Sequence, residues 1–118
     1  MINKRKLGAS YEDSAAEYLI CNGYRIIERN YRISCGEIDI IAQKDSILVF
    51  FEIKFRRNEA CGGPLEAVDL RKQRKICKTA LYYYSTHGYS ENIQCRFDVI
   101  GIYGNESIHH IENAFDFI

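Results

Sequence analysis

Two apolar segments separated by a short polar one constrain the fold of this chain most. Residues 36–42 read Gly-Glu-Ile-Asp-Ile-Ile-Ala, and residues 47–55 are apolar except for Glu52 and Lys54 near their end. Both segments are typical of β-strands, and the polar residues 43–46 between them are typical of a turn. The sequence therefore predicts a β-hairpin at the centre of the fold.

Helical and extended patterns flank this hairpin. Apolar residues recur at helical spacing over residues 10–22, before Gly23, and over residues 65–86, with a break or cap near Asp69. The strands expected outside the hairpin are residues 24–31, 96–103 and 108–111. The order α-β-β-β-α-β-β predicts an α/β domain with a mixed sheet.

Length and composition limit the class of protein. The 118 residues suffice for one hydrophobic core, which predicts a single domain over residues 1–118. Nine Tyr, six Phe and 47% hydrophobic residues exclude global disorder. No apolar run approaches the ~18 residues of a membrane span, and charged residues interrupt the N-terminal segment where a secretory signal would be apolar. We therefore expect a cytoplasmic protein without a membrane partner.

Charge is balanced overall but not along the chain. Sixteen basic and sixteen acidic residues give a net charge of zero, which on its own argues against nucleic-acid binding. However, residues 54–78 carry eight basic and three acidic residues, whereas residues 94–118 carry one basic and four acidic residues. A solvated helix accounts for the basic segment, and charge alone favours it, but such asymmetry can also form a phosphate-binding face on a neutral protein.

Metal-binding patterns outside the hairpin are weak. The five cysteines are odd in number and contain no C-x-x-C spacing, so neither a zinc site nor a disulfide framework is supported. His109 and His110 are adjacent, and in a strand they would point to opposite faces. We expect reduced thiols and no metal at these histidines.

The hairpin collects charged residues at the end away from its turn. A four-residue turn would pair Ala42 with Ile47 and place Asp39 opposite Phe50. Asp39 and Glu52 would then be diagonal neighbours on one face, roughly 7–8 Å apart at Cα. Glu37 and Lys54 would share that face, because side chains alternate along a strand.

Two carboxylates on one sheet face suggest a metal site. Like charges opposed across a sheet are destabilising unless a cation lies between them. Carboxylate oxygens suit Mg²⁺ or Mn²⁺, with water and a substrate phosphate as further ligands. A neighbouring lysine can orient and activate a water or neutralise charge in the transition state. Surface ion pairs explain the bare D-x12-E-x-K pattern equally well, and placement on one face favours the metal site.

The segments 36–42 and 48–56 resemble the UPF0102 (YraN-like) family. That family is assigned to the PD-(D/E)xK restriction-endonuclease-like superfamily and is similar to archaeal Holliday junction resolvases. Further matching segments are residues 8–19, 29–32, 63–68, 72–74, 96–99 and 110–115. The resemblance covers nearly the whole chain and implies a restriction-endonuclease-like mixed β-sheet of about five strands, flanked by helices.

The resemblance also implies roles for the charged residues of the hairpin. Asp39 and Glu52 would bind the metal, Lys54 would be catalytic, and Glu12 would add a further catalytic and metal-binding acid. An ordinary acid in the first turn of a helix, favoured there by the helix dipole, remains an equal alternative for Glu12. The sequence departs from the family at Tyr11, where Gly is usual, and at Phe55, where Thr is usual and where our register predicts the apolar face.

A basic set next to the hairpin would contact the nucleic-acid backbone without reading sequence. Gln73 matches a helix position that faces the site in related nucleases, and a solvated helix surface is its equal alternative. The residues expected to bind nucleic acid are Arg56, Arg57, Arg71, Lys72, Gln73, Arg74 and Lys75.

These observations predict a Mg²⁺- or Mn²⁺-dependent nuclease that hydrolyses phosphodiester bonds, with DNA favoured and branched or junction DNA as the expected substrate. A homodimer would suit a junction-cleaving enzyme, since two strands need two sites. One alternative is a non-catalytic nucleic-acid-binding module on the same fold. Another is a structural or adapter protein whose partner or dimer surface is formed by residues 82–84 and Tyr89.

Overall fold

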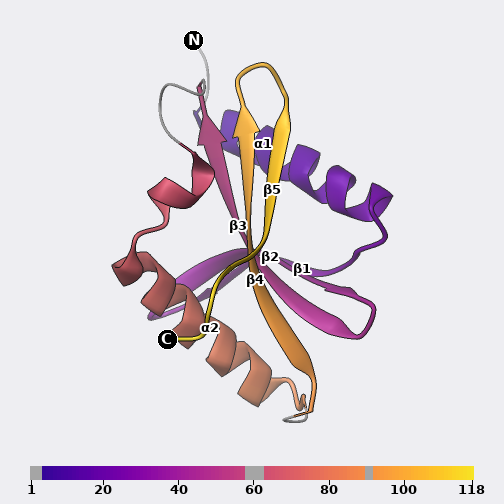
Figure 1. Ribbon diagram of the computed structural model, residues 1–118, viewed down its shortest axis with the longest axis vertical. Helices are drawn as coiled ribbons and strands as arrows, with labels where there is room; N and C mark the ends of the chain where they lie inside the picture. Colours follow the sequence, from indigo (N-terminus) through magenta and orange to yellow (C-terminus); the bar gives the residue numbers. More distant parts are fainter. Residues whose placement is uncertain (1–3, 58–62, 90–91) are drawn as a thin grey trace.

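A five-stranded mixed β-sheet with one α-helix on each face forms the fold (Figure 1). The computed structural model describes residues 4–57, 63–89 and 92–118. The elements are α1 (Lys4–Cys21), β1 (Arg25–Ile33), β2 (Gly36–Lys44), β3 (Ile47–Arg56), the 3-10 helix η2 (Pro64–Ala67), α2 (Leu70–Thr86), β4 (Gln94–Tyr103) and β5 (Ile108–Phe115). The predicted order of helices and strands is confirmed.

The strands lie in the order β1-β2-β3-β4-β5. All neighbouring pairs are antiparallel except β3 and β4, which are parallel. A parallel pair needs a long crossover, and here the crossover carries η2 and α2. This mixed topology is compatible with a restriction-endonuclease-like fold.

The turn of the β2–β3 hairpin is tighter than predicted. Lys44 pairs with Ile47, and Ala42 pairs with Val49 rather than with Ile47. The two turn residues, Asp45 and Ser46, both have positive φ angles of 51° and 68°. Such a two-residue turn matches the right-handed twist of the strands, whereas a four-residue turn would end the ladder two residues earlier. The predicted register was therefore wrong by two residues.

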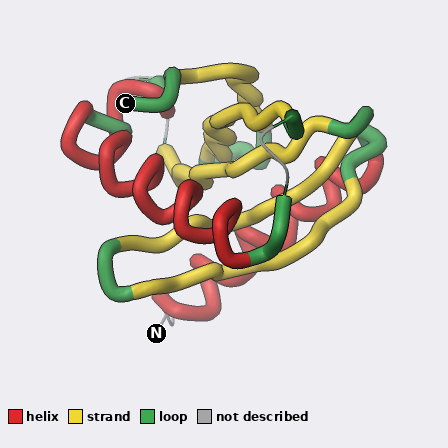
Figure 2. The backbone as a smooth tube through the Cα atoms, turned by 90° about the horizontal axis from the view of Figure 1, so that it is seen from below, coloured by secondary structure: helices red, strands yellow, loops and turns green. Residues whose placement is uncertain are grey.

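Both faces of the sheet are covered by helices, as the view from below also shows (Figure 2). Ala15 and Leu19 of α1 pack with Phe51 on one face. Ile76 and Tyr83 of α2 pack with buried residues of the other face, among them Ile41, Leu48 and Phe50. The hairpin is thus apolar on both faces near its turn. Its charged residues gather at the opposite end.

Local sequence signals set the helix boundaries. The Asp69 side chain accepts a 2.9 Å hydrogen bond from the Lys72 backbone N–H, which confirms the predicted cap before α2. α1 starts at Lys4 instead of near residue 10, because residues 4–7 are mostly good helix formers. No helix within the described ranges combines the length and apolarity needed to cross a membrane.

Candidate functional site

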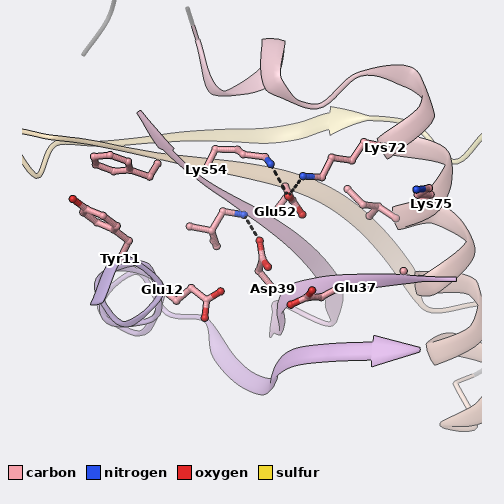
Figure 3. A pocket seen from close by; sticks show the side chains of 12 residues that line it. Tyr11, Glu12, Glu37, Asp39, Glu52, Lys54, Lys72 and Lys75 are labelled. Atoms are coloured by element: carbon pink, nitrogen blue, oxygen red, sulfur yellow. Dashed lines mark hydrogen bonds and ion pairs between the residues drawn. The ribbon is translucent and has the colours of Figure 1, made fainter. Parts of the chain in front are cut away.

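A pocket of about 380 Å³ opens at the end of the β2–β3 hairpin that lies away from the turn (Figure 3). It is bounded by β2 and β3, by α1 on one side and by α2 on the other. The lining residues are Tyr11, Glu12, Gly36, Glu37, Asp39, Glu52, Ile53, Lys54, Phe55, Lys72, Lys75 and Ile76. All four residues predicted to be catalytic line this one pocket.

A side-chain hydrogen bond continues the β2–β3 pairing where the backbone ladder stops. The last paired residues are Ile40 and Phe51. Beyond them, Asp39 Oδ2 accepts a 2.8 Å hydrogen bond from the Ile53 backbone N–H. Continuation of the observed register sets Asp39 opposite Glu52, so the predicted diagonal arrangement, with Asp39 opposite Phe50, was wrong. The two carboxylates face each other because the turn is two residues long.

The environment of Asp39 disfavours its charge. Burial, and after it the nearby charges of Glu52, Glu12 and Glu37, together raise the pKa of this carboxyl to about 7, although the hydrogen bond from the Ile53 N–H lowers it. The hydrogen bond from Ile53 thus compensates the charge of an ionised Asp39 only in part. A divalent cation beside Asp39 and Glu52 would supply that compensation.

Two lysines share the Glu52 carboxylate. Glu52 is only 7% exposed, and its Oε1 lies 2.8 Å from Lys72 Nζ and 3.3 Å from Lys54 Nζ. Burial lowers the pKa of Lys54, and the neighbouring Lys72 lowers it too. Burial acts in the same direction on Lys72, but its hydrogen bonds to Glu52 and Lys54 raise its pKa overall. Lys72 thus holds its proton more firmly than Lys54.

The structure brings Glu12 to the pocket. The Asn30 amide nitrogen donates to both Glu12 oxygens at 3.2 and 3.1 Å, in the amide orientation that this bonding pattern assigns. Arg29 of β1 lies 4.0 Å from Glu12, so α1 is fixed over the charged end of the sheet. The alternative of an acid in the first helical turn was wrong, because α1 begins at Lys4 and Glu12 lies in its interior.

The two residues that depart from the resemblance described above, Tyr11 and Phe55, are in contact. The rings of Tyr11 and Phe55 stack with centroids 4.2 Å apart and planes at 18°. Phe55 shares the apolar α1-side face of Phe51 and Ile53, as the sequence predicted, but it is 40% exposed and lines the pocket. The predicted face is therefore correct, since Tyr11 belongs to the α1-side core that includes Phe51, but Phe55 itself is only partly buried.

The donor set suits a hard cation with few protein ligands. Among the described residues, no three His, Cys, Asp or Glu side chains lie close enough together to enclose a metal ion. Mg²⁺ is commonly held by one or two carboxylates and completes its octahedron with waters and substrate phosphate. Asp39 and Glu52 fit that pattern, and Glu12 lines the same pocket.

The basic residues divide between the pocket and its surroundings. Lys72 and Lys75 line the pocket, and together with Asp69 and Arg71 they line an adjoining hollow. Arg74 is exposed on α2, and Arg56 and Arg57 follow Lys54 at the end of β3. Gln73 does not line the pocket; its side-chain amide donates to the Val68 carbonyl at 2.9 Å and closes the junction between η2 and α2.

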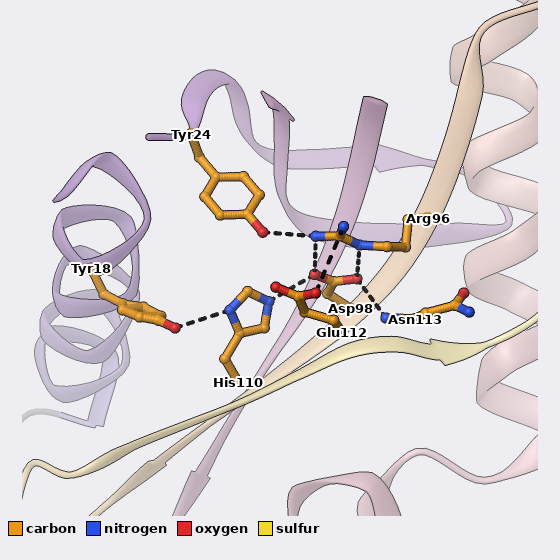
Figure 4. A network of polar contacts seen from close by, with 7 residues as sticks. All are labelled: Tyr18, Tyr24, Arg96, Asp98, His110, Glu112 and Asn113. Atoms are coloured by element: carbon orange, nitrogen blue, oxygen red, sulfur yellow. Dashed lines mark hydrogen bonds and ion pairs between the residues drawn. The ribbon is translucent and has the colours of Figure 1, made fainter. Parts of the chain in front are cut away.

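A second polar cluster, which the sequence did not predict, lies on the α1 side of the sheet (Figure 4). The Asp98 side chain is fully buried; it accepts two hydrogen bonds from Arg96, at 2.8 and 2.9 Å, and contacts His110 Nε2 at 2.7 Å. Tyr18 of α1 bonds to His110 Nδ1 at 3.0 Å. Burial raises the pKa of Asp98, but the bonds from His110, Arg96 and the Asn113 backbone outweigh it and lower the pKa. This cluster joins α1, β4 and β5.

The alternation of Arg96 and Asp98 along one strand could have indicated their pairing, since residues two apart share a face. Strand alternation could not have indicated that His110 contacts Asp98. Its contact with Asp98 depends on the β4–β5 pairing and on the approach of α1.

Comparison with known proteins gives one consistent result. The sequence profile of the uncharacterised protein family UPF0102 matches residues 11–102. A UPF0102 protein of Lachnoclostridium phytofermentans is 46% identical over 115 residues, which cover 98% of this chain and 97% of the relative. One of Prosthecochloris aestuarii is 47% identical over 118 residues, with 92% of each chain covered.

Proposed function

Starting from the fact that this chain belongs to the UPF0102 family, we propose that it is a metal-dependent nuclease that hydrolyses phosphodiester bonds in DNA. The observation that carries the proposal is the facing pair Asp39 and Glu52 in a pocket, with Lys54 two residues beyond Glu52 on the same strand. Burial and neighbouring acids raise the pKa of Asp39. Such a raised carboxyl pKa is typical of functional sites, including those that bind a cation.

Asp39 and Glu52 would hold Mg²⁺ or Mn²⁺, and Glu12 would act as an outer acid of the same site. When bound, the metal would polarise a phosphoryl oxygen and favour a hydroxide nucleophile. The role of Asp39 is to present a carboxylate whose direction the Ile53 N–H fixes. A fixed ligand loses little conformational entropy when the metal and the substrate assemble.

Lys54 would position the attacking water. Burial lowers the pKa of Lys54, which brings it closer to the range useful for proton transfer near neutral pH. Its contact with Glu52 holds the ammonium group over the pocket at 3.3 Å from the carboxylate. From there Lys54 can donate to the water or neutralise charge on the phosphoryl oxygens.

The substrate backbone would lie across the basic surface around the pocket. Arg56, Arg57, Arg71, Arg74 and Lys75 would contact phosphates, and such contacts carry no sequence information. This arrangement favours branched or junction DNA over a fixed sequence. Two copies of the chain would then serve the two strands of a junction.

A cleavage assay tests the proposal. Labelled four-way junctions, flaps, single strands and duplex would be incubated with Mn²⁺, Mg²⁺ or EDTA, with wild type and Asp39→Asn, Glu52→Gln and Lys54→Met purified identically. Glu66→Gln, an exposed acid on η2, is the matched control. We expect metal-dependent cleavage by wild type and the control, and none by the three pocket variants. Equal cleavage by wild type and Asp39→Asn would refute the nuclease.

The contact of Glu52 with two lysines favours one second candidate, a nucleic-acid-binding module without catalysis. In that case Lys72 and Lys54 would neutralise Glu52 permanently and the pocket would need no cation. This candidate predicts salt-dependent binding that survives EDTA and no cleavage with either metal. Measurement of DNA binding in EDTA, beside the cleavage assay, distinguishes the binding module from the nuclease.

A further inference from the structure

An aromatic stack forms one wall of the pocket, directly beside the lysine of the site. Tyr11 of α1 and Phe55 of β3 stack at 4.2 Å, and Phe55 follows Lys54 in sequence (Figure 3). Tyr11 is half-buried against the α1 side of the sheet, whereas Phe55 is 40% exposed. One face of the Phe55 ring covers Tyr11, and the exposed part of the ring is available to a further aromatic group.

Two lysines of α2 lie across the pocket from the aromatic stack (Figure 3). Lys72 and Lys75 line the same space as the aromatic pair, and the carboxylates of the candidate metal site lie in the lining between them. A pocket with a cationic side and an exposed aromatic side matches a ligand that is anionic at one end and aromatic at the other. A nucleotide has this composition, because one sugar joins its phosphate to its base.

We propose that Tyr11 and Phe55 form a stacking platform for an unpaired base that flanks the phosphate held in the pocket. The proposal rests on the proposed nuclease function and specifies its substrate. In the interior of a duplex both faces of each base are covered by neighbouring bases, so a base within a strand must leave the duplex stack before it can stack on Phe55. The substrate is therefore single-stranded next to the cleaved bond, as in a flap, a strand end or the branch point of a junction.

Binding in the absence of cleavage tests the platform. A fluorescently labelled single-stranded DNA oligonucleotide and the same strand with abasic sites would be titrated in EDTA, and again in Ca²⁺. The variants are Phe55→Leu and Tyr11→Leu, which keep apolar bulk but remove the ring. The control is Tyr82→Leu, an aromatic residue that is 52% exposed on α2. Thermal melting followed by circular dichroism confirms that each variant is folded.

Base–aromatic stacking predicts that Phe55→Leu weakens binding of the normal strand by roughly tenfold. Tyr11→Leu should act in the same direction, because it removes the ring that supports Phe55. Neither variant should change binding of the abasic strand, and Tyr82→Leu should change neither. The same titrations are repeated with an RNA strand of the same sequence. If wild type binds RNA more tightly than DNA and the ring variants lose that RNA binding, the assignment to DNA is overturned.

The outcomes separate this proposal from the nuclease. If wild type binds and cleaves but Phe55→Leu is indistinguishable from it on both strands, the platform is refuted and the nuclease stands. If the ring-dependent difference appears but no metal supports cleavage, the platform stands and the nuclease is refuted. Lack of wild-type binding to single strands in both EDTA and Ca²⁺ overturns the platform. If Phe55→Leu or Tyr11→Leu lowers the melting temperature without changing DNA binding, the platform is refuted. The stack then serves only to hold α1 on the sheet.

Discussion

The Asp39 carboxylate accepts a 2.8 Å hydrogen bond from the backbone N–H of Ile53, the residue between Glu52 and Lys54. This bond replaces a backbone carbonyl by a side chain at the point where the β2–β3 ladder ends. It fixes three side chains relative to one another, because Glu52 and Lys54 flank the donor on the same strand. The geometry of the candidate site thus follows from the termination of a β-ladder.

Replacing Asp39 should stabilise the metal-free protein at alkaline pH. The pKa of Asp39 is raised from 3.8 to about 7, so the folded state loses stability as the pH rises through this range. The loss is complete above pH ~7 and amounts to at most about 4 kcal/mol. In EDTA at pH 8, Asp39→Asn should therefore resist urea better than wild type, and the difference should vanish towards pH 4.

The exposed turn residue Asp45 provides the control, as Asp45→Asn should follow the pH dependence of wild type. Addition of Mn²⁺ at pH 8 should stabilise wild type but not Asp39→Asn. Identical pH profiles of wild type and Asp39→Asn would show that Asp39 ionises without strain in the folded protein.

Lys72→Met should strengthen metal binding. Lys72 Nζ lies 2.8 Å from Glu52 Oε1, where it competes with any cation for that carboxylate. Removal of one positive charge at this distance should raise Mn²⁺ affinity at least about tenfold. Isothermal titration calorimetry measures the change. Lys75→Met, which alters the same pocket from the next turn of α2, should have a smaller effect, and weaker binding by Lys72→Met would contradict the competition.

Asp98→Asn should destabilise the fold strongly at neutral pH. The variant leaves Arg96 and His110 in a buried cluster without their carboxylate, at a cost of about 3–5 kcal/mol. Because the pKa of Asp98 is lowered in the fold, its stabilising effect is present above the unfolded pKa of about 3.8 and is lost as the pH falls through the folded value. The deficit measured by urea denaturation should therefore shrink in acid.

Glu112→Gln is the matched control for this cluster. Glu112 also contacts Arg96, but at 4.0 Å and with a side chain that is 62% exposed. Its removal should change the free energy of unfolding by less than about 1 kcal/mol. Comparable losses from Asp98→Asn and Glu112→Gln would mean that burial does not govern the cluster.

Gly36→Ala should disturb the packing of α2 on β2. A Cβ at this position would overlap Thr79 Oγ1, which is fully buried and donates to the Lys75 carbonyl at 2.8 Å. We expect a loss of about 1–3 kcal/mol in unfolding free energy and reduced cleavage, because Lys72 and Lys75 are carried by the displaced helix. Thr79→Ala should partly rescue Gly36→Ala, since Thr79 Cβ would lie at an ordinary 3.7 Å. If Thr79→Ala does not rescue Gly36→Ala, the overlap with Thr79 Oγ1 is not the cause of the lost stability.

The sequence predicted the elements well and their register poorly. The β2–β3 hairpin, the cap at Asp69 and the order of strands depend on local patterns, which remain readable in a single chain. The register depends on whether the hairpin turn has two or four residues. The polar residues 43–46 allow both turns, and Gln43 stays in the sheet because it pairs with Arg25 of β1.

For the site, the sequence by itself determined the relation between Glu52 and Lys54, since residues two apart on a strand share a face. Only the tertiary structure decided which residues join them. Lys72 comes from α2, whereas Glu12 and Tyr11 come from α1, and their contacts depend on how these two helices cross the sheet. Periodicity fixes which face of an element is apolar, but it carries no information about which distant side chain lies against that face.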